Sequence, residues 1–206
     1  DDYDSFNNFL ESLASRKRKQ IRRERREALT AGLSIRALSG DDIQEHHWDA
    51  FFHFYQETSS RKWGMPYLTR EFFSLLGQNM GDQVVLMIAE NAGRPIAGAL
   101  NLMSNHTLYG RNWGAVEYHK FLHFELCYYQ AIDYAIAHGL KRVEAGAQGE
   151  HKLLRGYMPC PTYSGHWIAN PSFRGAIEDY LQRETRQVNW EINALGSHSP
   201  FRKDTP

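Results

Sequence analysis

Apolar residues recur at helical spacing in several parts of the chain. Residues 3–29 contain no Pro or Gly and repeat Phe6, Leu10, Leu13 and Ile21, which predicts one long amphipathic helix. Four further helices are expected. The first carries Trp48, Phe51, Phe52 and Tyr55 and is capped by Asp41 and Asp42, and the second runs from Thr69 to about 77–81. The third covers 122–138 and stops at Gly139, and the fourth runs from Pro171 or Ser172 towards Leu195.

Short apolar or alternating runs predict the strands. Residues 83–90 and 95–104 flank the turn NAGR and read as a hairpin, and 106–115 follows as a third strand. Further strands are expected at 34–38, 141–147 and about 163–168, with a short helix between the last two. A meander followed by a β–α–β crossover predicts an α/β fold whose mixed sheet has helices on both faces.

Composition narrows the class of protein. The 206 residues are 42% hydrophobic and 13% aromatic, which is typical of one packed domain of ordinary size. The two cysteines, Cys127 and Cys160, fit neither a metal spacing nor a disulfide framework, so a cytoplasmic location is expected. No apolar run approaches the length of a membrane span. Because the chain begins without methionine, we expect it to be a piece of a longer product.

Charge is unevenly distributed along a chain whose formal net charge is zero. The run RKRKQIRRERR, residues 16–26, holds eight cations and one acid, a local charge of +7. Such a cluster suits nucleic acid, including a tRNA, and it also suits a phosphorylated precursor or a membrane surface. A solvated helix that joins two domains is the other interpretation, and the sequence leaves these open.

Candidate chemistry gathers in VEAGAQGEHKLLRGYMPCPTYSGHW, residues 143–167. This segment gathers an acid, a base and two cations within six residues, which indicates a loop that holds a ligand. Glu150 and His151 are the candidate catalytic acid–base residues, and Lys152 and Arg155 are candidates to bind an anionic group. The backbone near Gly146 and Gly149 is open to close approach. The alternative is that GEHKLLR simply begins a short surface helix.

The same residues carry a resemblance to a family. The blocks GAQGEHKLLRGYMPCPTYSGHWIANPSFRGAIEDYLQRE, LHFELCYYQAIDYAI and RKRKQIRRERR resemble FemAB-related, GNAT-like proteins associated with peptidoglycan biosynthesis. The resemblance implies a GNAT-like fold for residues 31–206 and transfer of an acyl or aminoacyl unit to an amine, such as that of a peptidoglycan precursor. It also implies that residues 1–30 form a basic joint to a preceding N-terminal unit.

The resemblance leaves the acyl donor open. GNAT enzymes that use acetyl-CoA hold its pyrophosphate with a (Gln/Arg)-x-x-Gly-x-(Gly/Ala) loop at a helix start. The nearest string, residues 111–116, ends in Val116 and lies ahead of the helix. Acyl-CoA and aminoacyl-tRNA are both retained as co-substrates, and no tightly bound cofactor is expected. The substrate-binding candidates are Lys152, Arg155, Gln148, Gly149, Tyr157, His166, Trp113 and Arg111.

Other side chains receive weaker interpretations. His119 and His123 have a spacing that suits a metal, but no third ligand is evident, and no metal site is expected. Cys160 lacks an assigned histidine partner for nucleophilic chemistry. Two further functions remain alternatives: a non-catalytic binding module of the same fold, and an RNA-binding protein that acts through residues 16–26.

Overall fold

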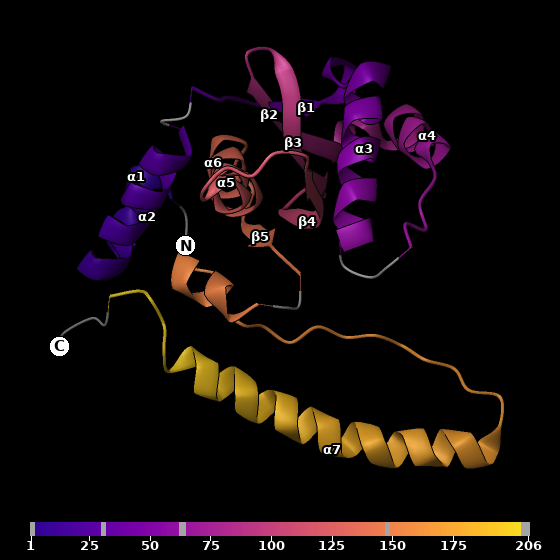
Figure 1. Cartoon of the computed structure of the whole chain (residues 1–206). Coiled ribbons are helices and arrows are strands. Elements are labelled where there is room, and N and C mark those ends of the chain that lie inside the picture. The colour runs from indigo at the N-terminus through magenta and orange to yellow at the C-terminus, as the bar shows by residue number, and fades with distance from the viewer. Residues whose placement is uncertain (1–2, 30–31, 62–64, 147–148, 203–206) are drawn as a thin grey trace. The chain divides into compact units, whose positions relative to one another are not determined.

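The computed structural model describes residues 3–29, 32–61, 65–146 and 149–202 (Figure 1). It divides into two compact units, residues 1–148 and residues 149–206. Each unit is described by itself. No helix among the described residues combines the length and the apolar character that crossing a membrane requires.

The first unit is built on a five-stranded sheet in the order β1-β2-β3-β4-β5. The first four strands are antiparallel neighbours, and β5 runs parallel to β4. The β2–β3 turn places Ala92 and Gly93 at positive φ, 50° and 78°, as the tight NAGR hairpin requires. The strands are β1 Ser34–Ser39, β2 Val84–Asn91, β3 Arg94–Met103, β4 Thr107–Ala115 and β5 Arg142–Glu144.

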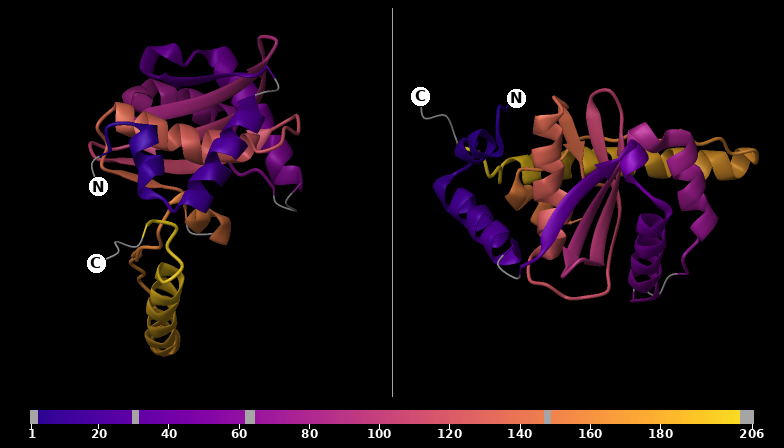
Figure 2. Two further views of the ribbon diagram at one scale, coloured as in Figure 1. Left: turned by 90° about the vertical axis from the view of Figure 1, so that its left-hand side faces the viewer. Right: turned by 90° about the horizontal axis from the view of Figure 1, so that it is seen from above.

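Helices cover both faces of this sheet (Figure 2). Two of them, α3 (Glu45–Arg61) and α4 (Arg70–Met80), lie on one face. The crossover from β4 to β5 lies on the other, as α5 (Leu122–Phe124), the π-helical turn η3 (Glu125–Tyr129) and α6 (Gln130–Ala137). The mixed sheet covered on two sides confirms the predicted fold class.

Strand β2 shows why the pattern there is continuously apolar rather than alternating. Val85, Met87 and Ala89 belong to the core under α5 and α6. Val84, Leu86 and Ile88 belong to the core under α3 and α4, with Phe51, Phe54 and Phe73. Both faces of the strand are therefore buried, as a strand between two helical layers must be.

The predicted long N-terminal helix is two helices, α1 (Phe6–Ser12) and α2 (Ser15–Leu29). The chain is extended at Leu13, whose side chain is completely buried. Breaking the helix there buries Leu13 together with Phe9 and Leu10, and the burial of these apolar side chains offsets the lost helical hydrogen bonds.

Three further predictions differ from the structure. Asp41 and Asp42 form the short 3₁₀ turn η1 (Gly40–Asp42) instead of capping α3. Strand β5 spans only Arg142–Glu144 of the expected 141–147. The expected strand at 163–168 is absent from the second unit as far as it is described, where the elements are the 3₁₀ helix η4 (Glu150–Arg155) and α7 (Pro171–Gly196).

Other boundaries agree with the sequence. Thr69 caps α4 by accepting a hydrogen bond from the amide of Phe72 at 3.3 Å, and α7 begins with Pro171 after an Asn170 cap. Gly139 has a φ of 66° just after α6, as a helix stop requires.

Candidate functional site

Strands β4 and β5 pair over three residues only, so most of β4 extends beyond β5. Only Thr107, Leu108 and Tyr109 have β5 partners among the described residues, so β4 from Gly110 onward continues without one. Between Gly110 and Asn112 the register with β3 shifts, which leaves Arg111 as a bulged residue. Bulges redirect side chains, and Arg111 donates to the hydroxyl of Tyr67 at 3.2 Å. On this side, β4 therefore has no strand partner beyond Tyr109 among the described residues.

Trp113 lies on the same free part of β4 but faces the α5–α6 core. Its ring contacts that of His123 at a centroid distance of 5.1 Å. The neighbouring Asn112 was not singled out in the sequence. Its buried side-chain oxygen has no hydrogen-bond partner among the described residues. No sequence signal could have found Asn112, because its significance lies in burial alone.

The string that approaches the CoA-binding pattern lies mostly inside β4 and not in a loop. A Cβ on Gly114 would lie 2.3 Å from the carbonyl oxygen of Phe54, so this glycine allows α3 to pack against the strand. A glycine covered by a helix cannot receive a phosphate. Residues 111–116 therefore do not form a pyrophosphate cradle.

In the second unit, His151 lies against Gly149. A Cβ on Gly149 would be 2.6 Å from Cε1 of His151, so the imidazole occupies the space that a side chain would fill. Gly149 also has a φ of 107°, which other residues rarely adopt. Local desolvation, followed by the charges of Arg155 and Lys152, lowers the pKa of His151. A neutral imidazole near pH 7 is the form that accepts a proton.

Arg155 holds this turn together from inside. Its Nη1 donates to the carbonyl oxygen of His151 at 2.8 Å, and its side chain is buried at 3% exposure. The amide of Tyr157 donates to the carbonyl oxygen of Lys152 at 3.2 Å. Arg155 is therefore buried in the turn that carries His151, and its binding of an anionic group stays a prediction.

The structure brings together some of the predicted site residues. Gly149, His151, Lys152, Arg155 and Tyr157 share one compact turn around η4. Arg111 and Trp113 are neighbours on β4 in the first unit. His166 lies in an exposed segment, where its Nε2 is 2.9 Å from the hydroxyl of Ser164. Glu150 is the first residue of η4, and Gln148 lies outside the described residues.

The described residues around the histidines and cysteines do not indicate a metal site or a catalytic thiol. The described ranges contain no group of three or more metal-type ligands. Nε2 of His119 is instead 3.2 Å from the carboxylate of Glu117. Cys127 is half-buried and Cys160 is exposed.

A comparison with models of protein families shows the family to which this chain belongs. The model for FemAB-like proteins, described as peptidoglycan biosynthesis/recognition, matches residues 1–203. The chain belongs to the FemAB-like family. No curated protein matches this FemAB-like sequence.

Solved structures support the fold of the FemAB-like chain. A probable acetyltransferase superimposes with a TM-score of 0.50 and 12% identity, over 66% of this chain and 98% of that one. An aminoglycoside N-acetyltransferase in complex with CoA gives 0.49 and 11%, over 67% and 95%. A possible acetyltransferase from Clostridium difficile gives 0.48 and 9%, over 67% and 99%. The likeness to the first of these structures, at 12% identity, shows a GNAT-like fold alone.

Proposed function

We propose that this FemAB-like protein is an N-acyltransferase that moves an acyl or aminoacyl group from an activated donor to an amine, with a peptidoglycan-precursor-like amine as the acceptor. The placement of His151 against Gly149 carries the proposal, because it fixes an imidazole whose pKa is lowered. Family membership and the GNAT-like fold support the same class of reaction.

The chemistry needs few groups. Neutral His151 accepts a proton from the acceptor ammonium, and the freed amine nitrogen then attacks the donor carbonyl carbon. A C–N bond forms, the bond from the carbonyl carbon to the carrier sulfur or oxygen breaks, and the carrier leaves with its electron pair and takes up a proton. Arg155 holds the His151 carbonyl, and Lys152 binds the anionic part of the donor. Glu150 is the alternative base.

The first experiment is a transfer assay on the full-length protein with acyl-CoA and aminoacyl-tRNA as donors and a muropeptide amine as acceptor. We expect His151→Asn to lower kcat/KM by about 100-fold or more, as the loss of a general base does. His198→Asn, at an exposed position just after α7, is the control and should keep the rate. An unchanged rate in His151→Asn overturns the role of His151, and ligand binding without turnover by any donor favours a binding module.

The outer face of α2 favours aminoacyl-tRNA as the donor. Five of its cations are exposed at near-helical repeats: Arg16, Lys19, Arg22, Arg23 and Arg26. Helix α2 buries Ile21 and Ala28 on its other face, so this cationic stripe points outward and suits a phosphate backbone.

A salt titration of tRNA binding tests this donor. Replacing Arg16, Lys19 and Arg23 with Gln should reduce the slope of log K against log salt by about two units. Replacing Arg174, Arg183 and Arg186 of α7 should leave the slope unchanged. Equal slopes in both triple variants would exclude the α2 stripe as the tRNA contact and leave acyl-CoA as the donor to test.

A further inference from the structure

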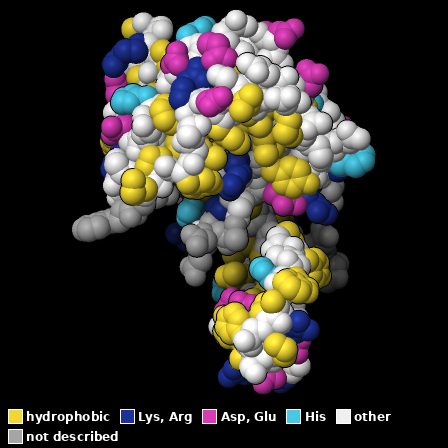
Figure 3. Space-filling view, turned by 90° about the vertical axis from the view of Figure 1, so that its right-hand side faces the viewer, with side chains coloured by type: hydrophobic (Ala, Val, Ile, Leu, Met, Phe, Trp, Pro, Cys, Tyr) yellow, Lys and Arg dark blue, Asp and Glu magenta, His cyan; other side chains and the backbone are white. Residues whose placement is uncertain are grey.

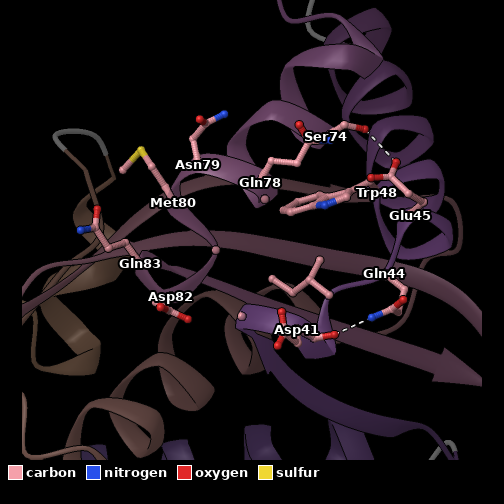
Figure 4. A pocket seen from close by; sticks show the side chains of 14 residues that line it. Asp41, Gln44, Glu45, Trp48, Ser74, Gln78, Asn79, Met80, Asp82 and Gln83 are labelled. Atoms are coloured by element: carbon pink, nitrogen blue, oxygen red, sulfur yellow. Dashed lines mark hydrogen bonds between the residues drawn. The ribbon is translucent and has the colours of Figure 1, made fainter.

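A pocket of about 490 Å³ lies in the first unit, between the start of α3 and the end of α4 (Figure 4). Its wall continues through η1 and η2 (Gly81–Gln83), where β1 ends and β2 begins. Val84, at the start of β2, pairs with Leu102 of β3, and Leu102 pairs with Tyr109 of β4. Residues 110–115 of β4 therefore extend from this level towards the other end of the sheet. Within the first unit, the pocket therefore lies at the opposite end of the sheet from residues 110–115 of β4.

The lining is acidic and rich in amides. It carries three carboxylates, from Asp41, Glu45 and Asp82, and it contains no Lys or Arg. Glu45 is compensated, because Arg70 and Ser74 each bind its Oε2 at 2.7 Å. Asp41 and Asp82 have no ion-pair partner within the part of the chain that the structure describes. The amide side chains are those of Gln44, Gln78, Asn79 and Gln83.

An indole forms the floor of the pocket. Trp48 is 1% exposed, and a Cβ on Gly77 would lie 2.9 Å from its ring nitrogen. The absence of a side chain at Gly77 therefore lets the indole ring pack close against the backbone of α4. The described residues supply no hydrogen-bond acceptor to this N–H, which is the usual need of a buried indole. Figure 4 shows the Trp48 ring among the pocket side chains, below Ser74 and Gln78 of α4.

Two glycines keep the opposite wall thin. Gly40 of η1 and Gly81 of η2 approach closely, since a Cβ on Gly81 would lie 3.7 Å from the Cα of Gly40. A Cβ on Gly40 would lie 3.1 Å from Oδ1 of Asp82. Larger side chains at these positions would push Asp82 and η1 into the space. The carboxylate of Asp82 therefore lies close to Gly40.

We propose that this pocket binds a small hydroxylated amine of the amino-sugar class. The ammonium group would pair with Asp41 and Asp82, which are the two uncompensated carboxylates. A hydroxyl oxygen would accept the Trp48 N–H, and further hydroxyls would pair with the side-chain amides, which both donate and accept. Metal ions are a poor match, because these carboxylates do not form a ligand group of three in the described structure.

Nuclear magnetic resonance can follow the Trp48 indole N–H directly while D-glucosamine is titrated into the full-length protein. We expect this resonance to shift at millimolar ligand, while those of the other tryptophans stay in place. D-glucose should bind at least about tenfold more weakly, because it lacks the charge that pairs with Asp41 and Asp82. Cyclohexylamine, which has the charge and no hydroxyl, should leave the Trp48 N–H signal in place.

Two variants locate the site. Asp41→Asn combined with Asp82→Asn should weaken glucosamine binding by about tenfold or more, and Asp179→Asn on exposed α7 is its control. Gly77→Ala should displace the indole, which the new methyl group would meet at 2.9 Å, and so weaken glucosamine binding, whereas Gly175→Ala, with nothing within 4 Å, should not. No shift of the Trp48 signal with glucosamine overturns the proposal, as does equal binding of glucose. Neither result bears on His151 and the transfer reaction.

Discussion

The guanidinium of Arg25 binds the carboxylate of Glu125 through two nitrogens, although 100 residues separate them in the sequence. Nη2 of Arg25 also lies 2.6 Å from Asp133, and the guanidinium stacks 4.2 Å over the ring of Phe6. Buried Glu24, which precedes Arg25 in α2, accepts a hydrogen bond from the hydroxyl of Tyr129. The basic helix is therefore fixed to η3 and α6 by its inner face.

Removing Arg25 should destabilise the first unit strongly. Glu125 is 0% exposed, so Arg25→Gln leaves a buried carboxylate whose remaining side-chain partner among the described residues is Gln130. We expect a loss of about 3 kcal/mol in the free energy of unfolding, measured by urea denaturation. Arg22→Gln, on the exposed face of α2, should change it by less than about 0.5 kcal/mol. Similar losses in both variants would show that the ion pair contributes little.

Gly114→Ala should also destabilise the unit. The added methyl group would meet the Phe54 carbonyl at 2.3 Å, so α3 must move away from β4. We expect a loss of about 1–3 kcal/mol, visible as a lower Tm. Gly175→Ala, inside α7 and facing open space, should be neutral or stabilising by up to about 1 kcal/mol. An unchanged Tm in Gly114→Ala would mean that this close approach is not maintained in solution.

His47 should make stability depend on pH. Burial, with the nearby charges of His46 and Arg36, lowers the pKa of His47, although Glu90 opposes the shift. Its Nδ1 accepts a hydrogen bond from the amide of Gln44 at 3.0 Å, which protonation would break.

The unfolded chain, with a His pKa of about 6.5, therefore binds more protons than the folded one in this range. The free energy of unfolding should fall as the pH drops below about 7 towards the lowered pKa. His47→Asn should flatten this slope in urea unfolding between pH 5 and 8, a window set by the ordinary histidine pKa of about 6.5. His198→Asn should leave the pH dependence of the free energy of unfolding unchanged. If that dependence is also unchanged in His47→Asn, it arises from another group.

Gly149→Ala should displace His151. The new methyl group would meet the imidazole at 2.6 Å, and a φ of 107° is strained for alanine. We expect the pKa of His151 to rise towards its ordinary value as the ring moves into solvent, and the transfer rate to fall with it. Titration of the ring protons by nuclear magnetic resonance checks the first effect. Gly165→Ala, with nothing within 4 Å, is the control, and a pKa equal to that of the wild type contradicts the arrangement.

The sequence predicted the sheet well where local pattern and packing agree. Strands β2 and β3 are nearly as expected, because a continuous apolar run and an NAGR turn leave few alternatives. The break at Leu13 and the π-helical turn at 125–129 were not predictable, since each depends on contacts with residues far away in the sequence. Residues 163–168 have a sequence pattern typical of a strand. The second unit, as far as it is described, offers no neighbouring strand with which they could pair.

Candidate chemistry was easier to find than its arrangement. The cluster at 149–157 was visible as a run of acid, base and cations, but the burial of Arg155 was not, because it depends on the fold of the turn. The pocket near Trp48 carried no motif at all. The exposed apolar residues Phe72, Leu75 and Met80 of α4 were likewise indistinguishable from core residues, and hydrophobic side chains gather on the α3–α4 side of the first unit (Figure 3).

The Arg25–Glu125 contact joins two elements that the chain uses for different purposes. One is the helix that displays the cationic stripe, and the other is the crossover that leads out of β4 and into β5. A force applied to α2 by a bound polyanion would therefore be transmitted through a buried ion pair to the connection that spaces the two parallel strands. Glu125 is therefore the point at which α2 is anchored to this crossover.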